Sequence, residues 1–340
     1  MKLRNYNSPL GKKNTLLRFL SVAAALFAPT PPACATASAD AQLNAPTIFL
    51  VVGTPGAPEY ETNMIRQAEL WAALARQAGA SFVQIGPEDG TSATARDQLH
   101  QRLATDPTKT SAPLWLVLIR HGTFDGKEAR FNLRGPDLSA MDLAEWLQPF
   151  QRPLIILNTA SASAPFLSKL SSSNRILVTA TRSGHEQNVT RFGLFLAESM
   201  HAAGVDLDQD GQISLLEAFL TASRKVAEFY KTEGRLATEH ALLDDNGDGR
   251  GTEADWFRGI RAVKKPDGGL AVDGARAHQV HLLLSSEEQA LPPSLRARRD
   301  VLELEVFRLR ESKENIPEPE YFNRLESLLL ELARLRKGKH

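Results

Sequence analysis

Residues that could perform hydrolytic chemistry follow two apolar runs in this sequence. The first run, residues 114–119, is followed by His121 and Gly122. The second run, residues 154–157, is followed by small and mostly polar residues: Asn158, Thr159, Ala160, Ser161, Ala162 and Ser163. A histidine is suited to general-base catalysis, and a serine hydroxyl becomes a nucleophile when such a base activates it. Because the carboxyl ends of parallel strands converge on one crevice, we expect both segments to contribute to one site.

The elements that would position these residues alternate between strands and helices. Apolar runs predict buried strands at residues 47–52, 81–85, 114–119, 154–157 and 176–179. Helical periodicity predicts helices at residues 61–78, 94–103 and 215–230, and a capping-box pair predicts another that opens at Ser139 and Asp142. This alternation predicts an α/β fold, a three-layer α/β/α sandwich with a mostly parallel sheet.

Residues 206–217 match the twelve-residue EF-hand loop that binds calcium. The pattern places oxygen donors at alternate positions, a glycine at position six and a glutamate that can bind with both oxygens at position twelve. The predicted ligands are Asp206, Asp208, Asp210, Gln212, Ser214 and Glu217. The alternative is an acidic, solvated turn before a helix.

Residues 244–255 follow the same pattern less closely. The corresponding positions are Asp244, Asn246, Asp248, Arg250, Thr252 and Asp255. Gly251 stands where the pattern has an apolar residue, and Asp255 is one methylene shorter than the usual closing glutamate. The segment is interpreted either as a second calcium loop, paired with the first through the helix between them, or as a simple turn.

Composition and charge exclude some classes of partner. The chain has 340 residues, 42% of them hydrophobic, and its 40 basic residues balance 40 acidic ones. Phosphate binding needs a concentrated cationic face, so we do not expect a nucleic-acid partner. After the first thirty residues no stretch is apolar and long enough to span a bilayer, so no membrane span is expected after signal cleavage.

Residues 1–39 have the three parts of a secretory signal peptide. Basic residues precede an apolar segment at 19–27, and residues 37–39 form a small-residue cleavage site, with 33–35 as an alternative cut. We therefore expect a secreted or periplasmic protein that begins near Asp40; an N-terminal membrane anchor is the alternative. Cleavage at this site removes Cys34, the only cysteine, and leaves the mature chain without a thiol.

The C-terminal part differs in character from the rest. We assign residues 40–265 to one domain that includes both acidic loops, and residues 266–340 to a short strand and a helical hairpin. The strand is predicted at 280–284, and the two amphipathic helices at 295–313 and 318–336, separated by prolines. The apolar seam of the last helix favours packing on the body or on a partner.

Between residues 47 and 200 the order of elements and motifs resembles the legumain-like branch of the caspase-fold cysteine peptidases. The resemblance implies a caspase-like sandwich and assigns the family's roles to positions in this chain. His121 would be the general base, Gly122 would supply a backbone N–H to the oxyanion hole, and Ala160 stands at the position of the cysteine nucleophile. The region around Glu186 is similar to the wall of the family's substrate pocket, with a solvated loop as the alternative.

Alanine at the nucleophile position removes the family's chemistry, because alanine has no nucleophilic atom. Asn158 also replaces the acidic residue that the family usually has. We therefore expect an exported, calcium-binding pseudopeptidase that binds a peptide or protein partner without cutting it. The alternative is a hydrolase in which Ser161 or Ser163 is the nucleophile and His121 the base, with Asp125 as the candidate to orient the histidine.

Overall fold

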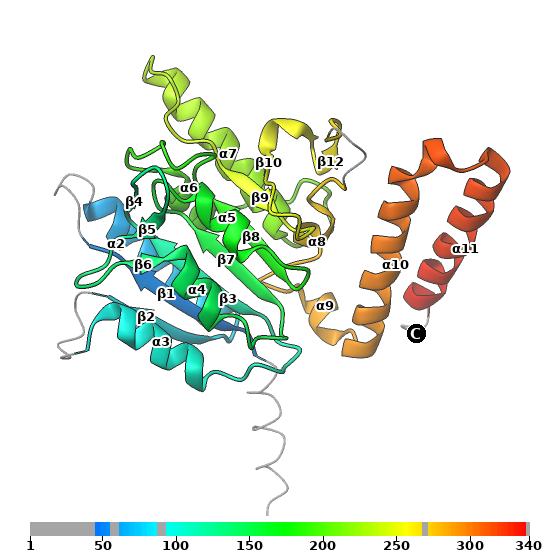
Figure 1. Cartoon of the computed structure of the whole chain (residues 1–340). Coiled ribbons are helices and arrows are strands. Elements are labelled where there is room, and N and C mark those ends of the chain that lie inside the picture. The colour runs from blue at the N-terminus through cyan, green and yellow to red at the C-terminus, as the bar shows by residue number, and fades with distance from the viewer. Residues whose placement is uncertain (1–44, 55–60, 87–92, 267–270, 338–340) are drawn as a thin grey trace, which may run out of the picture.

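A seven-stranded sheet forms the centre of the computed structural model, which describes residues 45–54, 61–86, 93–266 and 271–337 (Figure 1). The strand order is β10-β9-β8-β7-β3-β1-β2. The bounds are β1 Thr47–Val52, β2 Ser81–Ile85, β3 Leu114–Ile119, β7 Leu154–Asn158, β8 Arg175–Thr179, β9 Leu242–Asp244 and β10 Thr252–Glu253. The first five are parallel to one another. At the β8 edge, β9 pairs antiparallel with β8, and β10 pairs antiparallel with β9.

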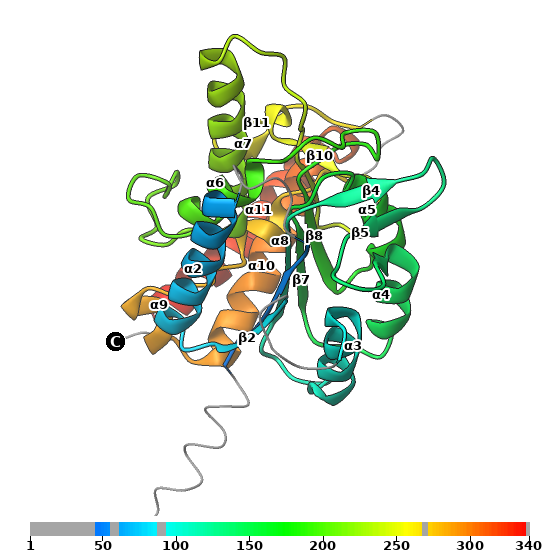
Figure 2. The ribbon, with the colours of Figure 1, turned by 90° about the vertical axis from the view of Figure 1, so that its left-hand side faces the viewer.

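Helices cover both faces of this sheet. One face carries α2 (Glu61–Gln77), α6 (Phe192–Ser199) and α7 (Leu215–Thr232), and the other carries α3 (Ala95–Thr105), α4 (Ala140–Trp146) and α5 (Ala164–Leu170), as the edge-on view in Figure 2 shows. β1, β3, β7 and β8 are buried along their whole length, which explains their uninterrupted apolar sequences. The predicted three-layer sandwich with a mostly parallel sheet is confirmed.

Local sequence signals fix several helix ends. Thr94 caps α3 by accepting a hydrogen bond from the Asp97 N–H. Ser139 and Asp142 form the predicted capping box at the start of α4. Short polar side chains in these positions satisfy backbone N–H groups that have no partner within the helix.

A small antiparallel sheet between β3 and α4 was not predicted. It contains β4 (Gly122–Phe124), β5 (Ala129–Phe131) and β6 (Leu138–Ser139) in sequential order. Strands of two or three residues are too short to show an apolar alternation, which is why the sequence gives no signal for them. This small sheet begins directly after His121 and so decides where that residue lies.

The predicted strand at residues 280–284 is wrong. The segment makes a single isolated bridge, between Ser214 and His281, and its apolar side chains pack against the core instead. It lies between the short helices α8 (Ala275–His278) and α9 (Ser286–Ala290). The apolar sequence therefore serves side-chain packing, which periodicity alone does not distinguish from a buried strand.

The predicted helical hairpin is present beside the body of the molecule (Figure 1). It consists of α10 (Pro293–Glu311) and α11 (Glu318–Lys337). A short hairpin of β11 (Phe257–Arg258) and β12 (Arg261–Ala262) precedes it. The predicted signal peptide, with Cys34, lies outside the described residues.

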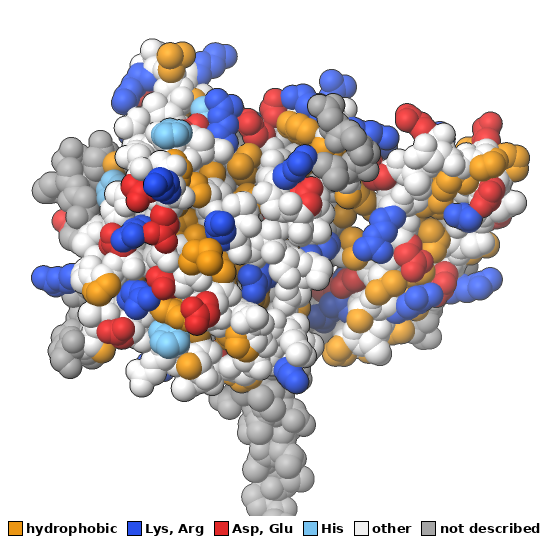
Figure 3. Space-filling view, viewed as in Figure 1, with side chains coloured by type: hydrophobic (Ala, Val, Ile, Leu, Met, Phe, Trp, Pro, Cys, Tyr) orange, Lys and Arg blue, Asp and Glu red, His pale blue; other side chains and the backbone are white. Residues whose placement is uncertain are grey.

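Two observations bear on partners. Among the described helices, none has the length and apolar character needed to cross a membrane. On the face shown in Figure 3, basic and acidic side chains are intermingled over the whole surface. That face offers no concentrated cationic patch of the kind that phosphate backbones require.

Candidate functional site at the strand ends

His121 lies at the carboxyl end of β3, as predicted. The residue before it, Arg120, has a φ of 115°, a left-handed conformation that redirects the chain from β3 into β4. Partial burial of His121 lowers the pKa of its imidazole, and the nearby Arg120 charge lowers that pKa further. The ring is therefore neutral at pH 7. It has no hydrogen bond or ion pair with another residue in the part of the chain that the structure describes.

Ser161 binds directly to the backbone of Gly122. The Gly122 N–H donates to Ser161 Oγ at 3.1 Å, and the same hydroxyl donates to the Gly122 carbonyl oxygen at 3.0 Å. A side chain at position 122 would collide with the Ser161 carbonyl oxygen, which explains the glycine. The N–H that the resemblance assigns to an oxyanion hole is thus already occupied by a side chain of the same protein.

Ala160 does not face an open crevice. Only 1% of its surface is exposed, and it belongs to the hydrophobic core beneath α3, α4 and α5. Its N–H donates to the side-chain oxygen of Asn158 at 3.2 Å, so this asparagine closes a local turn at the end of β7. The position assigned to the nucleophile is therefore part of the core.

The other two groups of the predicted serine-hydrolase site have structural partners. Ser163 Oγ accepts hydrogen bonds from the Ala180 and Thr181 N–H groups at 3.1 and 3.3 Å, which ties the end of β7 to the end of β8. Asp125 is exposed and accepts hydrogen bonds from the Lys127 and Glu128 N–H groups, both at 2.8 Å. Asp125 thus stabilises the β4–β5 turn and does not orient His121.

The loop after β8 packs against β4, the strand that follows His121. The side chain of Gln187 donates to the Phe124 carbonyl oxygen at 3.1 Å, and His185 contacts the Phe124 ring edge-on. Within this loop, Glu186 accepts a hydrogen bond from the Ala162 N–H through its carbonyl oxygen at 2.8 Å. Its carboxylate lies 2.6 Å from Nδ1 of His240. Glu186 is therefore a fixed link between the turn after β7 and residues near β9.

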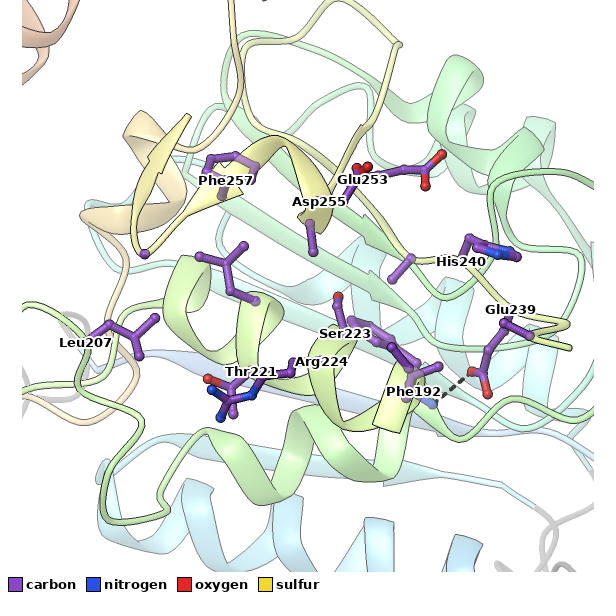
Figure 4. A pocket seen from close by; sticks show the side chains of 17 residues that line it. Phe192, Leu207, Thr221, Ser223, Arg224, Glu239, His240, Glu253, Asp255 and Phe257 are labelled. Atoms are coloured by element: carbon purple, nitrogen blue, oxygen red, sulfur yellow. Dashed lines mark hydrogen bonds between the residues drawn. The ribbon is translucent and has the colours of Figure 1, made fainter. Parts of the chain in front are cut away.

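A cavity of about 530 Å³ lies on the other side of that link (Figure 4). Apolar side chains of α7 and of the β10–β11 segment line most of it, and Glu239, His240, Glu253 and Asp255 are its acidic and imidazole groups. Glu239 is 2% exposed and accepts hydrogen bonds from the N–H groups at the start of α6; burial raises the pKa of its carboxyl. No sequence pattern indicates this cavity, because side chains of α6, α7 and residues 237–259 come together only in the folded chain.

The first acidic loop brings its carboxylates together. Asp206, Asp208 and Asp210 each have a carboxylate oxygen within 4.8 Å of the others, the convergence that calcium requires. The closing carboxylate, Glu217, is 1% exposed and accepts hydrogen bonds from the Leu207 N–H at 2.6 Å and the Ser214 N–H at 2.8 Å. α6 precedes the loop and α7 follows it. The donor set is all oxygen, which fits a hard cation.

The remaining predicted donors of this loop, Gln212 and Ser214, have hydrogen-bond partners within the protein. Gln212 and Ser214 precede α7, and the Ser214 hydroxyl caps that helix by accepting from the Glu217 N–H at 3.2 Å. The Ser214 hydroxyl and the Glu217 carboxylate thereby form a capping box, so the same residues start the helix and close the loop.

The second acidic loop starts from the sheet, at the end of β9, and its donors have other partners. Asp244 accepts from the Gly247 and Gly249 N–H groups at 2.9 and 3.0 Å, and Thr252 donates to Asp273 at 2.6 Å. Asp255 forms an exposed ion pair with Lys264. The side-chain oxygen of Asn246 accepts a hydrogen bond from the Asp248 N–H, and the carboxylate of Asp248 accepts one from the Arg250 N–H. Calcium binding by this loop stays a prediction.

Asp273 holds the second loop in place. Its carboxylate also accepts a hydrogen bond from the Asp245 N–H at 2.9 Å, and Asp245 in return accepts N–H groups at the start of α8. Burial, followed by the charge of Asp245, raises the pKa of Asp273 to about 8. Asp245 and Asp273 thereby hold the second acidic loop against the segment that leads to the C-terminal helical hairpin.

Comparisons with known proteins find similar structures but no similar sequences. No model of a known protein family matches the chain, and no curated protein sequence matches it. The initiator caspase Dronc of Drosophila is 12% identical, with 62% of this chain and 83% of that chain covered and a TM-score of 0.38. Caspase-1 from Spodoptera frugiperda is 8% identical (62% and 89% covered, TM-score 0.38). A protein of Geobacter sulfurreducens is 11% identical (58% and 92% covered, TM-score 0.39).

Proposed function

We propose that this protein is an exported, calcium-binding homologue of the legumain-like, caspase-fold peptidases that binds a peptide or protein partner and does not hydrolyse it. The observation that supports this best is the exchange of hydrogen bonds between Ser161 and Gly122. It occupies the only oxyanion donor that the resemblance assigns, and it uses the Ser161 hydroxyl at the same time. Acyl transfer needs both a free nucleophile and a free oxyanion donor.

The absence of hydrolysis is tested on the wild-type protein with a broad peptide library in calcium-replete buffer. We expect no cleavage product by mass spectrometry. Turnover that disappears both in His121→Ala and in Ser163→Ala, while the variants stay folded, would instead establish a serine hydrolase.

We propose calcium binding at residues 206–217 because three carboxylates converge beside a closing glutamate. Calcium that binds only the folded protein raises the melting temperature by mass action. Calorimetric titration of the wild type should give a saturable site that is lost in Asp206→Ala/Glu217→Gln. Asp248→Ala in the second loop is the matched control and should leave this site intact; equal calcium binding in wild type and double variant would contradict the assignment.

The cavity beside Glu186 supplies a binding surface for the proposed partner. Its apolar lining suits a hydrophobic side chain. The Glu253 and Asp255 carboxylates at its wall already pair with Arg182 and Lys264, so the apolar lining alone sets the preference. We expect peptides retained by the protein to carry an accessible apolar residue. Ala254→Leu, which fills the cavity, should abolish retention, whereas Ser168→Ala on α5 should not; undiminished retention by Ala254→Leu would place the binding surface elsewhere.

Export is proposed from the arrangement of residues 1–39 alone. Mass spectrometry of the protein from its native host should find a chain that begins near Asp40. A retained Met1 would contradict this proposal and return Cys34 to the mature chain.

A further inference from the structure

We infer that residues 278–285, here called the strap, position the calcium loop and transmit its occupancy to the C-terminal hairpin. The inference rests on the proposed calcium binding at residues 206–217 and adds a means of regulation to that site. The strap has contacts with both the loop and the hairpin, and these contacts come from adjacent residues.

Side chains tie the strap to the calcium loop at both of its ends. Nε2 of His278 lies 2.9 Å from Oδ2 of Asp208, and the Ser285 N–H donates to the side-chain oxygen of Gln212 at 3.1 Å. A carboxylate accepts and does not donate, so the His278 nitrogen in this contact carries the proton. Asp208 and Gln212 are two of the predicted calcium-ligating positions.

Backbone contacts join the same two segments between these ends. The Leu215 N–H donates to the Val280 carbonyl oxygen at 2.8 Å, and Ser214 forms an antiparallel bridge with His281. Ser214 and Leu215 are the last part of the loop and the first residue of α7. The strap therefore lies along the loop as a paired strand would.

The strap also holds the hairpin. Gln279, the residue after His278, donates to the Asp300 carbonyl oxygen of α10 at 2.8 Å and to Glu303 at 3.3 Å. Just beyond the strap, Glu288 of α9 pairs with Arg299 of α10 at 2.6 Å. A cavity of about 470 Å³ lies between the loop, the strap and the hairpin, lined among others by Asp208, Asp210, His278, Arg299 and Leu332.

When a hydrogen-bond donor binds one oxygen of a carboxylate, it fixes the direction in which the other oxygen can face a cation. His278 binds Oδ2 of Asp208 and so restricts the rotation of that side chain, which is the way outer groups commonly tune metal ligands. Calcium that holds Asp208 in turn holds His278, and with it Gln279 and α10. Coupling between calcium binding and hairpin docking is reciprocal. The docked hairpin therefore raises the calcium affinity by the same factor by which bound calcium raises the equilibrium constant for hairpin docking.

The test measures calcium affinity by calorimetry and hairpin docking by hydrogen–deuterium exchange of the α10 amides, both in the full chain. Calcium should slow exchange in wild-type α10. Because the His278–Asp208 contact is one partly exposed hydrogen bond to a charged group, His278→Ala should weaken calcium binding about 3- to 10-fold and remove the calcium effect on α10. His278→Gln restores an N–H donor and should recover most of both.

Two further variants complete the design. Gln279→Ala leaves the loop contact intact and should by itself speed exchange in α10, with a smaller loss of calcium affinity. Arg298→Ala removes an exposed hairpin ion pair with Glu331 and should change neither calcium affinity nor its effect on α10.

The outcomes separate the inference from the function on which it rests. If wild type binds no calcium, the proposed calcium site itself falls. If wild type binds calcium but α10 exchange is the same with and without it, or if His278→Ala binds calcium as tightly as wild type, only the role of the strap is overturned.

Discussion

Replacing Ser161 with alanine separates a structural hydroxyl from a catalytic one. The Ser161 hydroxyl is buried and makes two hydrogen bonds with the backbone of Gly122. The substitution deletes both and leaves an N–H and a carbonyl group without that partner. A lost hydrogen bond costs about 1 kcal/mol, and a buried polar group left unpaired costs about 1–3 kcal/mol. We expect the free energy of unfolding to fall by about 2–4 kcal/mol.

Urea denaturation followed by circular dichroism, in calcium-replete buffer, measures this change. Ser168→Ala is the matched control, since Ser168 Oγ makes an exposed hydrogen bond to the Pro165 carbonyl oxygen and its loss should stay within about 0.5 kcal/mol. If Ser161→Ala were as stable as the control and abolished a hydrolysis present in wild type, Ser161 would be a nucleophile and our reasoning about the site would be refuted.

Three further results are expected. Ala160→Cys should gain no peptidase activity in a fluorogenic peptide assay, because position 160 is buried in the core and the Gly122 N–H is occupied; activity that depends on His121 would contradict this. The pKa of Asp273, about 8 in the folded protein against 3.8 normally, means that the folded state keeps a proton that the unfolded state releases. The free energy of unfolding should therefore fall as pH rises from about 4 to about 8, and Asp273→Asn should flatten this slope in urea titrations at several pH values. Gly193→Ala should lower the melting temperature measured by calorimetry, since the added methyl group would collide with Gln67 and Thr159.

The sheet and its helices were predictable because they depend on local sequence. An uninterrupted apolar run such as residues 114–119 has few alternatives to a strand covered on both faces, and the alternation of such runs with helices favours a parallel sheet. The convergence of carboxylates in residues 206–217 was predictable for the same reason, because these residues lie within twelve positions of one another. Asp206, Asp208 and Asp210 converge as their spacing requires.

The site at the strand ends was predictable only in part. Sequence places His121 and Ser161 at neighbouring strand ends, but it does not show what each side chain contacts. The decisive contact, between Ser161 and Gly122, joins residues 39 positions apart. Asp273 and the strap also bind partners that are distant in the chain. Such pairings follow from how elements pack, and a single sequence carries no record of them.

Hydrogen bonds on several sides of the end of β7 hold position 160 in the core. Thr159 donates to the Leu118 carbonyl oxygen at 2.9 Å, and the carbonyl oxygen of Thr159 accepts from Thr190 at 2.6 Å. Gln67 of α2 donates to Thr159 Oγ1 at 3.2 Å, and Gly193 of α6 packs against the same side chain. Each partner would be lost if the chain moved to expose position 160. Because α6 also leads into the calcium loop, an ion bound there would stabilise the helix that holds this strand end, so calcium should make the site more rigid without making it reactive.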